Sequence, residues 1–184
     1  FKEIEKKYQK IDILVNVVGQ SEPGGPVEID SLTWQKQFTL NLDTAYFCIK
    51  FVIPIMEKNS GGSIVNISSV VGYNSGPVLA YGAAKAGIIN LTSALSTQWA
   101  KNRVRVNAVA PGALNTQMLD EIIQAGPEKV GSSFYDKSLK QKETGGAPLT
   151  VSADLIVFLG SDESNGITGK LISAMWDNWQ EWPK

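Results

Sequence analysis

The sequence predicts an α/β fold in which a parallel sheet is covered by helices on both faces, a doubly wound, three-layer arrangement. Short apolar segments alternate with longer segments of helical periodicity, which is the pattern of repeated β-α-β units. The strand segments are short and largely apolar, which is typical of strands buried on both faces. The length of 184 residues favours a single domain, residues 1–184.

The N-terminal third is predicted to contain the end of a helix, a strand and a long helix. Residues 1–10 carry apolar side chains at spacings of three and four, as a helix requires. Residues 11–19 are a short apolar run closed by glycine, which indicates a buried strand. Asp30 or Ser31 can cap a helix that continues to residue 58, and Pro54 is expected to kink its last turns.

The rest of the chain repeats this alternation. Strands are expected at residues 63–69 and 104–109, which are short and largely apolar. The long periodic segment between them predicts a helix over residues 79–101. A helix at about 151–160 and a strand near 170–173 complete the pattern. Because the carboxyl ends of parallel strands share one edge, we expect a ligand site there.

Residues 113–147 break the regular alternation. They are polar and interrupted by glycine, with weak helical patterning near 117–124 and 134–142. A connection of this length in a compact domain is usually functional, so we predict a mobile substrate lid. Its polar side chains favour a hydroxylated substrate such as a sugar or polyol; they are Asn115, Gln117, Asp120 and Glu121.

Composition excludes several functional classes. Seventeen Lys and Arg balance eighteen Asp and Glu, so no basic surface favours nucleic acid. The chain has no histidine, which removes Ser-His-Asp catalysis and histidine metal sites, and no metal is expected. The single cysteine, Cys48, indicates a reducing compartment, and we expect a cytoplasmic protein. No apolar run suggests a membrane span, and residues 1–7 do not resemble a secretory leader.

A Tyr-x-x-x-Lys pattern supplies candidate chemistry, because it places a phenol and an ammonium one helical turn apart. The ammonium is expected to lower the phenol pKa, so that the tyrosine can act as an acid or base without histidine. The pattern occurs at Tyr81/Lys85 and at Tyr46/Lys50. Tyr81 begins a helix at the predicted ligand edge, whereas Tyr46 lies within an apolar helical stripe. We therefore assign the chemistry to Tyr81 and packing to Tyr46.

Several ordered segments resemble the short-chain dehydrogenase/reductase family. They are Ser-Ile-Val-Asn-Ile-Ser-Ser-Val-Val-Gly at 63–72, Tyr-Gly-Ala-Ala-Lys-Ala-Gly at 81–87, and Val-Arg-Val-Asn-Ala-Val-Ala-Pro-Gly at 104–112. Residues 12–19, Asn41-Leu42 and residues 167–170 resemble further segments of that family. The resemblance covers nearly the whole chain. It implies a Rossmann-like fold and an NAD(P)-dependent oxidoreductase that interconverts an alcohol and a carbonyl by hydride transfer.

The same resemblance implies roles for individual residues. Tyr81 would be the acid/base, and Lys85 would lower its pKa and hold the nicotinamide ribose. Asn41 would hold a water in a proton relay. Ser69 would orient the substrate, although counting back thirteen residues from Tyr81 selects Ser68 instead. The implied positions near the cofactor, NAD or NADP, are Asn16, Gly19, Ile67, Tyr81, Lys85, Pro111, Gly112, Leu114 and Thr116.

The sequence departs from the family pattern at its beginning. It contains no Gly-x-Gly-x-x-Gly turn to cradle a pyrophosphate. We therefore expect this chain to be the C-terminal part of a longer enzyme, with N-terminal strands on the order of 60–80 residues missing. A bare sheet edge would then lie at the first strand. Near the other end, Trp176, Trp179 and Trp182 could stack on a substrate or pack at a subunit contact.

Three functions remain open from the sequence. The leading hypothesis is the oxidoreductase, acting on a small-molecule alcohol or carbonyl. A nucleotide-sugar epimerase or dehydratase shares the Tyr/Lys pair, but the short stretch after Gly112 argues against its usual extra domain. A non-catalytic, cofactor-binding scaffold would need none of Asn41, Ser69, Tyr81 and Lys85. A homo-oligomer, dimer or tetramer, is what the family resemblance implies.

Overall fold

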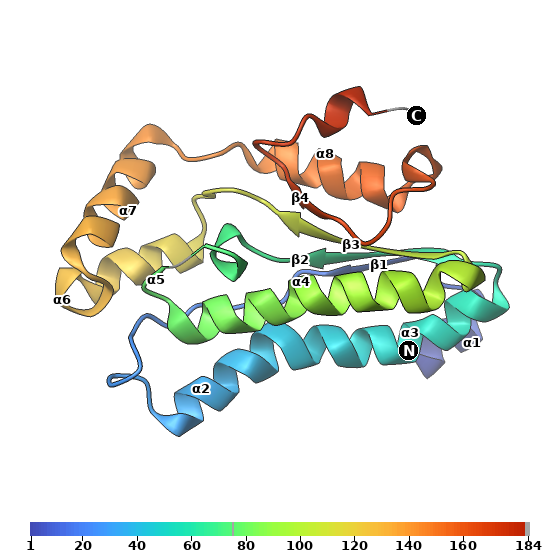
Figure 1. The fold of residues 1–184 in the computed structure, drawn as a ribbon, viewed down its shortest axis with the longest axis horizontal. Coiled ribbons are helices and arrows are strands. Elements are labelled where there is room, and N and C mark those ends of the chain that lie inside the picture. The colour runs from blue at the N-terminus through green and yellow to red at the C-terminus, as the bar shows by residue number, and fades with distance from the viewer. Residues whose placement is uncertain (75, 183–184) are drawn as a thin grey trace.

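The computed structural model describes residues 1–74 and 76–182 and contains a parallel sheet between layers of helices (Figure 1). Its strands pair in the order β1-β2-β3-β4, all parallel. Their bounds are β1 Ile13–Asn16, β2 Gly62–Ile67, β3 Val104–Ala110 and β4 Leu171–Ser173. The predicted three-layer α/β fold is therefore confirmed.

The helices lie on both faces of the sheet and beyond one end of it. In Figure 1, α3 and α4 cover one face, and α8 covers the other. The bounds are α1 Lys2–Tyr8, α2 Ser31–Phe38, α3 Thr44–Lys58, α4 Leu79–Trp99, α5 Gln117–Ala125, α6 Pro127–Val130, α7 Ser132–Thr144 and α8 Leu149–Gly160.

Two hydrophobic cores form on opposite faces of the sheet, because successive strand residues point to opposite sides. Ile64 and Val106 pack with α3 residues in one core. Val65 and Val109 pack with α8 residues in the other. All four side chains are fully buried. Burial on both faces explains why the apolar residues of these strands are not confined to alternate positions.

The predicted long helix over residues 31–58 contains an irregular turn. Thr39–Asp43 forms a single π-helical turn between α2 and α3, while α3 continues through Pro54 to Lys58. By length and composition alone, Ser31–Lys58 could cross a membrane, which the sequence reasoning did not anticipate. Its buried side chains, which include Ile49, Val52 and Met56, pack against the sheet as those of a core helix do.

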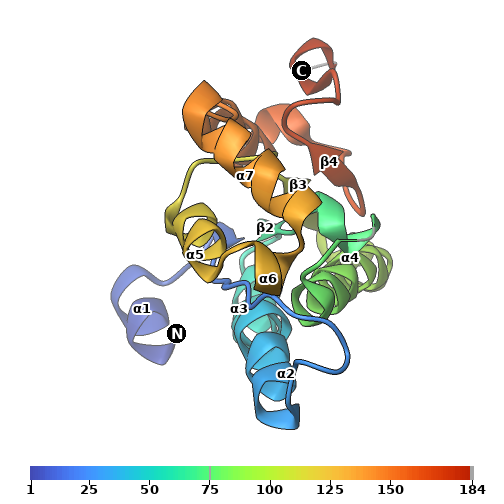
Figure 2. The same ribbon diagram turned by 90° about the vertical axis from the view of Figure 1, so that its left-hand side faces the viewer.

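Residues 113–147 fold into the three helices α5, α6 and α7. Figures 1 and 2 place them together past the carboxyl ends of the strands, where the ligand site is expected. The two regions of weak helical patterning correspond to α5 and α7. Gly126 and Gly131 separate the helices and adopt positive φ angles of 78° and 81°, which glycine tolerates without steric cost.

Candidate active site

A cavity of about 540 Å³ opens at the carboxyl ends of the strands. Loops after β1, β2 and β3, the first turns of α4, and helices α5 and α7 line it. Most of the predicted site residues share this one cavity wall: Gly19, Ile67, Ser69, Tyr81, Lys85, Pro111, Gly112, Leu114 and Thr116. Asn16 and Asn41 do not line it.

Tyr81 and Ser69 face each other across the start of α4. Tyr81 lies in the first turn of that helix and is buried. Ser69 follows β2, and its hydroxyl also accepts a hydrogen bond of 3.4 Å from the Val71 amide, which begins a 3₁₀ turn. Burial raises the pKa of Tyr81, and a hydrogen-bonding interaction with the Ser69 side chain offsets part of that rise.

The expected lowering of the Tyr81 pKa by Lys85 is therefore wrong for this structure. The Lys85 ammonium lies 5.5 Å from the centre of the Tyr81 ring and donates a 2.7 Å hydrogen bond to the Ile67 carbonyl. It consequently binds backbone rather than the phenol oxygen. Burial deprives the phenolate of hydration, and this effect dominates the Tyr81 pKa.

Lys85 is itself an unusual residue, because its side chain is only 3% exposed. Burial lowers its pKa from 10.5 to about 8. Within the described part of the chain, the structure records no carboxylate paired with Lys85. The amine can therefore change protonation state close to neutral pH, unlike an ordinary surface lysine.

Ser68 is held differently from Ser69. Its hydroxyl donates a 3.1 Å hydrogen bond to the backbone carbonyl of Lys85, and the residue is buried. The two serines are neighbours in an extended segment, so their side chains point in opposite directions. The structure thus brings the Ser69 hydroxyl, and not the Ser68 hydroxyl, to Tyr81.

Asn41 lies in the π-helical turn and holds the loop after β1 in place. Its side-chain nitrogen donates to the Gln20 carbonyl at 2.8 Å, and its side-chain oxygen accepts from the Gln20 amide at 3.1 Å. The same nitrogen contacts the Gln37 carbonyl at 2.9 Å. A Cβ atom added to Gly19 would fall 2.8 Å from the Asn41 oxygen, so only glycine allows this close approach. Sequence reasoning missed Gln20 and Gln37, because neither belongs to a motif.

Asn16 has a packing role between elements. Its side-chain nitrogen donates to the Asn66 oxygen at 2.8 Å, and Asn66 in turn donates to the Thr92 hydroxyl at 3.0 Å. This chain of amides joins β1, β2 and α4 outside the cavity. The structure therefore gives Asn16 a structural contact, and its position beside the cofactor stays a prediction.

Residues 113–147 contribute both apolar and polar side chains to the cavity wall, whereas the sequence predicts a polar lid. Met118, Leu119 and Ile122 from α5 line it, together with Phe134 from α7. Polar side chains of the same segment line it as well, namely Thr116, Gln117, Lys137, Ser138 and Gln141, whereas Asn115, Asp120 and Glu121 do not. The preference for a hydroxylated substrate therefore stays a prediction.

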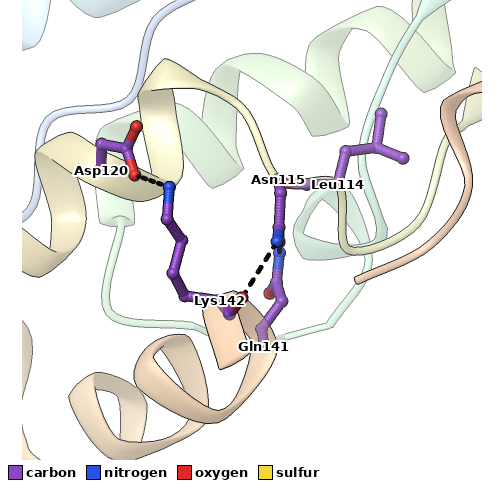
Figure 3. A network of polar contacts seen from close by, with 5 residues as sticks. All are labelled: Leu114, Asn115, Asp120, Gln141 and Lys142. Atoms are coloured by element: carbon purple, nitrogen blue, oxygen red, sulfur yellow. Dashed lines mark hydrogen bonds and ion pairs between the residues drawn. The ribbon is translucent and has the colours of Figure 1, made fainter. Parts of the chain in front are cut away.

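Polar side chains also tie α7 to α5 and to the loop after β3 (Figure 3). The Gln141 amide donates to the Leu114 carbonyl at 3.1 Å and to the Asn115 side-chain oxygen at 3.3 Å. Lys142 forms an ion pair with Asp120 at 2.6 Å, which joins α7 to α5. These contacts hold α7 against α5 and the loop after β3.

The three C-terminal tryptophans have different environments. Trp179 is buried in the α8 core, where its indole nitrogen donates to the Ala174 carbonyl at 3.2 Å. Trp182 packs partly against the same core. Trp176 is 73% exposed and lines the cavity. Only Trp176 among the three is therefore placed to meet a ligand in that cavity.

Comparison with known proteins identifies the family. The family model described as enoyl-(acyl carrier protein) reductase, a short-chain alcohol dehydrogenase model, matches residues 1–174. The chain is 40% identical to a 7alpha-hydroxysteroid dehydrogenase of Bacteroides fragilis, covering 91% of this chain and 64% of that protein. It is 37% identical to the 3-oxoacyl-(acyl-carrier-protein) reductase FabG of Thermotoga maritima, covering 92% and 66% respectively.

Solved structures show the same likeness. A putative short-chain dehydrogenase/reductase from Burkholderia xenovorans superposes with a TM-score of 0.83 at 35% identity, over 94% of this chain and 66% of that one. A gluconate 5-dehydrogenase from Burkholderia cenocepacia, solved with NADP and tartrate, gives a TM-score of 0.81 at 25% identity, over 94% and 66%. This chain thus spans just under two thirds of these relatives' length, and it belongs to the short-chain dehydrogenase/reductase family.

Proposed function

We propose that this chain carries the catalytic part of an NAD(P)-dependent oxidoreductase that interconverts an alcohol and a carbonyl. The observation that carries the proposal is the convergence of the Ser69 hydroxyl, the Tyr81 phenol and the Lys85 amine on one cavity at the strand ends. A packing role alone requires none of these groups at a cavity wall. The oxidoreductase relatives support the same conclusion.

Each side chain has a distinct task in carbonyl reduction. Because burial raises its pKa, Tyr81 keeps its proton at neutral pH and donates that proton to the substrate oxygen. Ser69 donates a hydrogen bond to the same oxygen and orients it. Lys85, with a pKa of about 8, returns a proton toward Tyr81 after turnover. In alcohol oxidation the same groups act in reverse.

The cavity also fits the nicotinamide end of the cofactor. Gly19, Ile67, Gly112 and Thr116 line the same cavity as Lys85, and Gly112 adopts a positive φ of 96°, which glycine tolerates. When bound there, the cofactor supplies the hydride. The residues of this chain bind and orient it at the nicotinamide end, since the sequence contains no glycine-rich turn for the pyrophosphate.

The test is turnover of NADH or NADPH with a panel of ketones, compared among matched variants. Tyr81→Phe should lower turnover by about 10²–10⁴-fold, the usual worth of a positioned acid. Tyr46→Phe, at the other Tyr-x-x-x-Lys pair, should leave turnover unchanged. Ser69→Ala should lower it by orders of magnitude and Ser68→Ala should have little effect. Full activity of folded Tyr81→Phe would favour the scaffold function instead.

The proposed enzyme acts as a homo-oligomer in a reducing, cytoplasmic compartment. An exposed aromatic group on α3 supports self-association: Tyr46 and Phe47 pack edge to face, and Phe51 stacks on Phe1. All four aromatic side chains remain more than a third exposed, which is unusual for a helix in a monomer. Sedimentation of the wild type and of Phe47→Glu tests this, and a monomeric wild type would contradict it.

A further inference from the structure

Helix α7 presents four side chains to the cavity at helical spacing: Phe134, Lys137, Ser138 and Gln141. Lys137 is the one charged side chain that the three helices α5, α6 and α7 contribute to the described cavity wall. The wall's other cation, Lys85, is buried and hydrogen bonded to the Ile67 carbonyl. No aspartate or glutamate lines the described part of the cavity.

Lys137 is also available for a ligand. The structure records ion pairs for Lys10, Lys58 and Lys142, but none for Lys137 within residues 1–74 and 76–182. Lys142, five residues further along α7, is already neutralised by Asp120. A lysine can lay its methylene stem on apolar surface while its ammonium stays hydrated, so Lys137 fits the rim of an apolar cavity.

The cavity therefore has three chemically distinct parts. Ser69 and Tyr81 form a polar end for a carbonyl or hydroxyl group. Met118, Ile122 and Phe134 form an apolar wall, and Lys137 adds an unpaired positive charge on the helix beside it. These three parts together complement an amphipathic molecule that carries a carbonyl or hydroxyl group, an apolar skeleton and a negative charge.

We propose that Lys137 determines substrate specificity, by selecting ketones or secondary alcohols whose apolar skeleton ends in an anionic group such as a carboxylate. The reacting end of this substrate rests on the function proposed above, whereas the anionic end rests on Lys137 alone. The residue contacts the bound anion and takes no part in proton transfer.

The test is calorimetric binding of 7-oxododecanoate and its methyl ester, two probes that differ by one charge. Lys137→Glu should weaken binding of the acid about fivefold or more and leave the ester unchanged, as expected for an exposed ion pair. The control is Lys140→Glu, which makes the same charge change at an exposed position on α7 outside the described cavity wall. It should alter binding of neither probe. Raising the salt concentration should weaken only the acid.

Several outcomes would overturn this inference. Equal binding of acid and ester by the wild type would do so, as would equal effects of the Lys137 and Lys140 substitutions. Weaker binding of NADPH in Lys137→Glu, with the acid unaffected, would assign the lysine to cofactor phosphates instead. Lys137→Gln, checked by circular dichroism, separates loss of charge from loss of fold. Because binding requires no turnover, a chain that prefers the acid but oxidises no NADPH would refute the proposed function alone.

Discussion

The buried amine of Lys85 should make the stability of the fold depend on pH. Its pKa is about 8 in the folded protein and 10.5 when exposed. Between these values the unfolded chain binds a proton that the folded chain has released, so the free energy of unfolding rises with pH. The full difference of 2.5 pKa units corresponds to about 3 kcal/mol. Below pH 8 this stabilisation is absent, because both states are protonated.

The accessible part of this effect lies between pH 7 and pH 9, where the free energy of unfolding should increase by about 1 kcal/mol. Tyr81 does not interfere, since its pKa is raised above 10 and its titration opposes stability only at higher pH. The assay is urea unfolding, followed by tryptophan fluorescence, at pH 7, 8 and 9 in a buffer of constant ionic strength.

The informative variant is Lys85→Met, which removes the titrating group and retains an apolar chain of similar length. Between pH 7 and pH 9, the free energy of unfolding of this variant should increase by about 1 kcal/mol less than that of the wild type. Lys50→Met, at the exposed lysine of the other Tyr-x-x-x-Lys pair, should keep the wild-type dependence. If Lys85→Met shows the same increase as the wild type, Lys85 is not a buried amine of lowered pKa.

Three further predictions follow from individual contacts. Gln37 is fully buried, and its side-chain nitrogen has no hydrogen-bond partner among the described residues. Gln37→Met should therefore raise the free energy of unfolding by about 1 kcal/mol. A lower melting temperature of the variant would instead indicate that the nitrogen binds a water or another partner. Asn41→Ala should lower the free energy of unfolding by about 2–3 kcal/mol, because the Gln20 amide and carbonyl both lose a buried partner. Hydrogen exchange at the Gln20 amide should also accelerate. Unchanged exchange would mean that Asn41 does not hold this loop. Asp120→Asn breaks an ion pair whose partners are both about half exposed. Chemical unfolding should therefore show that the free energy of unfolding falls by less than about 1 kcal/mol. A larger decrease would mean that the pair stabilises the helices cooperatively.

Local patterns were sufficient for the elements and for much of the site. The alternation of apolar strands with periodic helices depends on neighbouring residues only, and the four strands lie where it predicts them. The predicted residues Tyr81, Lys85 and Gly112 belong to contiguous motifs at strand ends, and parallel strands bring those ends to one edge. The structure accordingly places them on one cavity wall. Their catalytic roles remain predictions.

Tertiary packing determines the properties that depend on residues far apart in the sequence. The sequence spacing of Tyr81 and Lys85 predicts a lowered phenol pKa, but burial and the Ile67 carbonyl reverse the expectation. Asn41 holds a loop some twenty residues away in the chain, through Gln20. The composition of residues 113–147 is polar, yet Met118, Ile122 and Phe134 line the cavity, because composition averages over all faces of a helix and the fold turns particular faces toward the cavity.

The sequence by itself thus determined the α/β architecture and the family and supplied the candidate site residues, since all three are encoded in short-range patterns. Only the tertiary structure decided the protonation behaviour of Tyr81 and Lys85, the choice of serine that faces the phenol, and the apolar cavity with Lys137 beside it. The physical reason is that pKa values and cavity chemistry depend on burial, and burial is set by contacts between segments far apart in the chain.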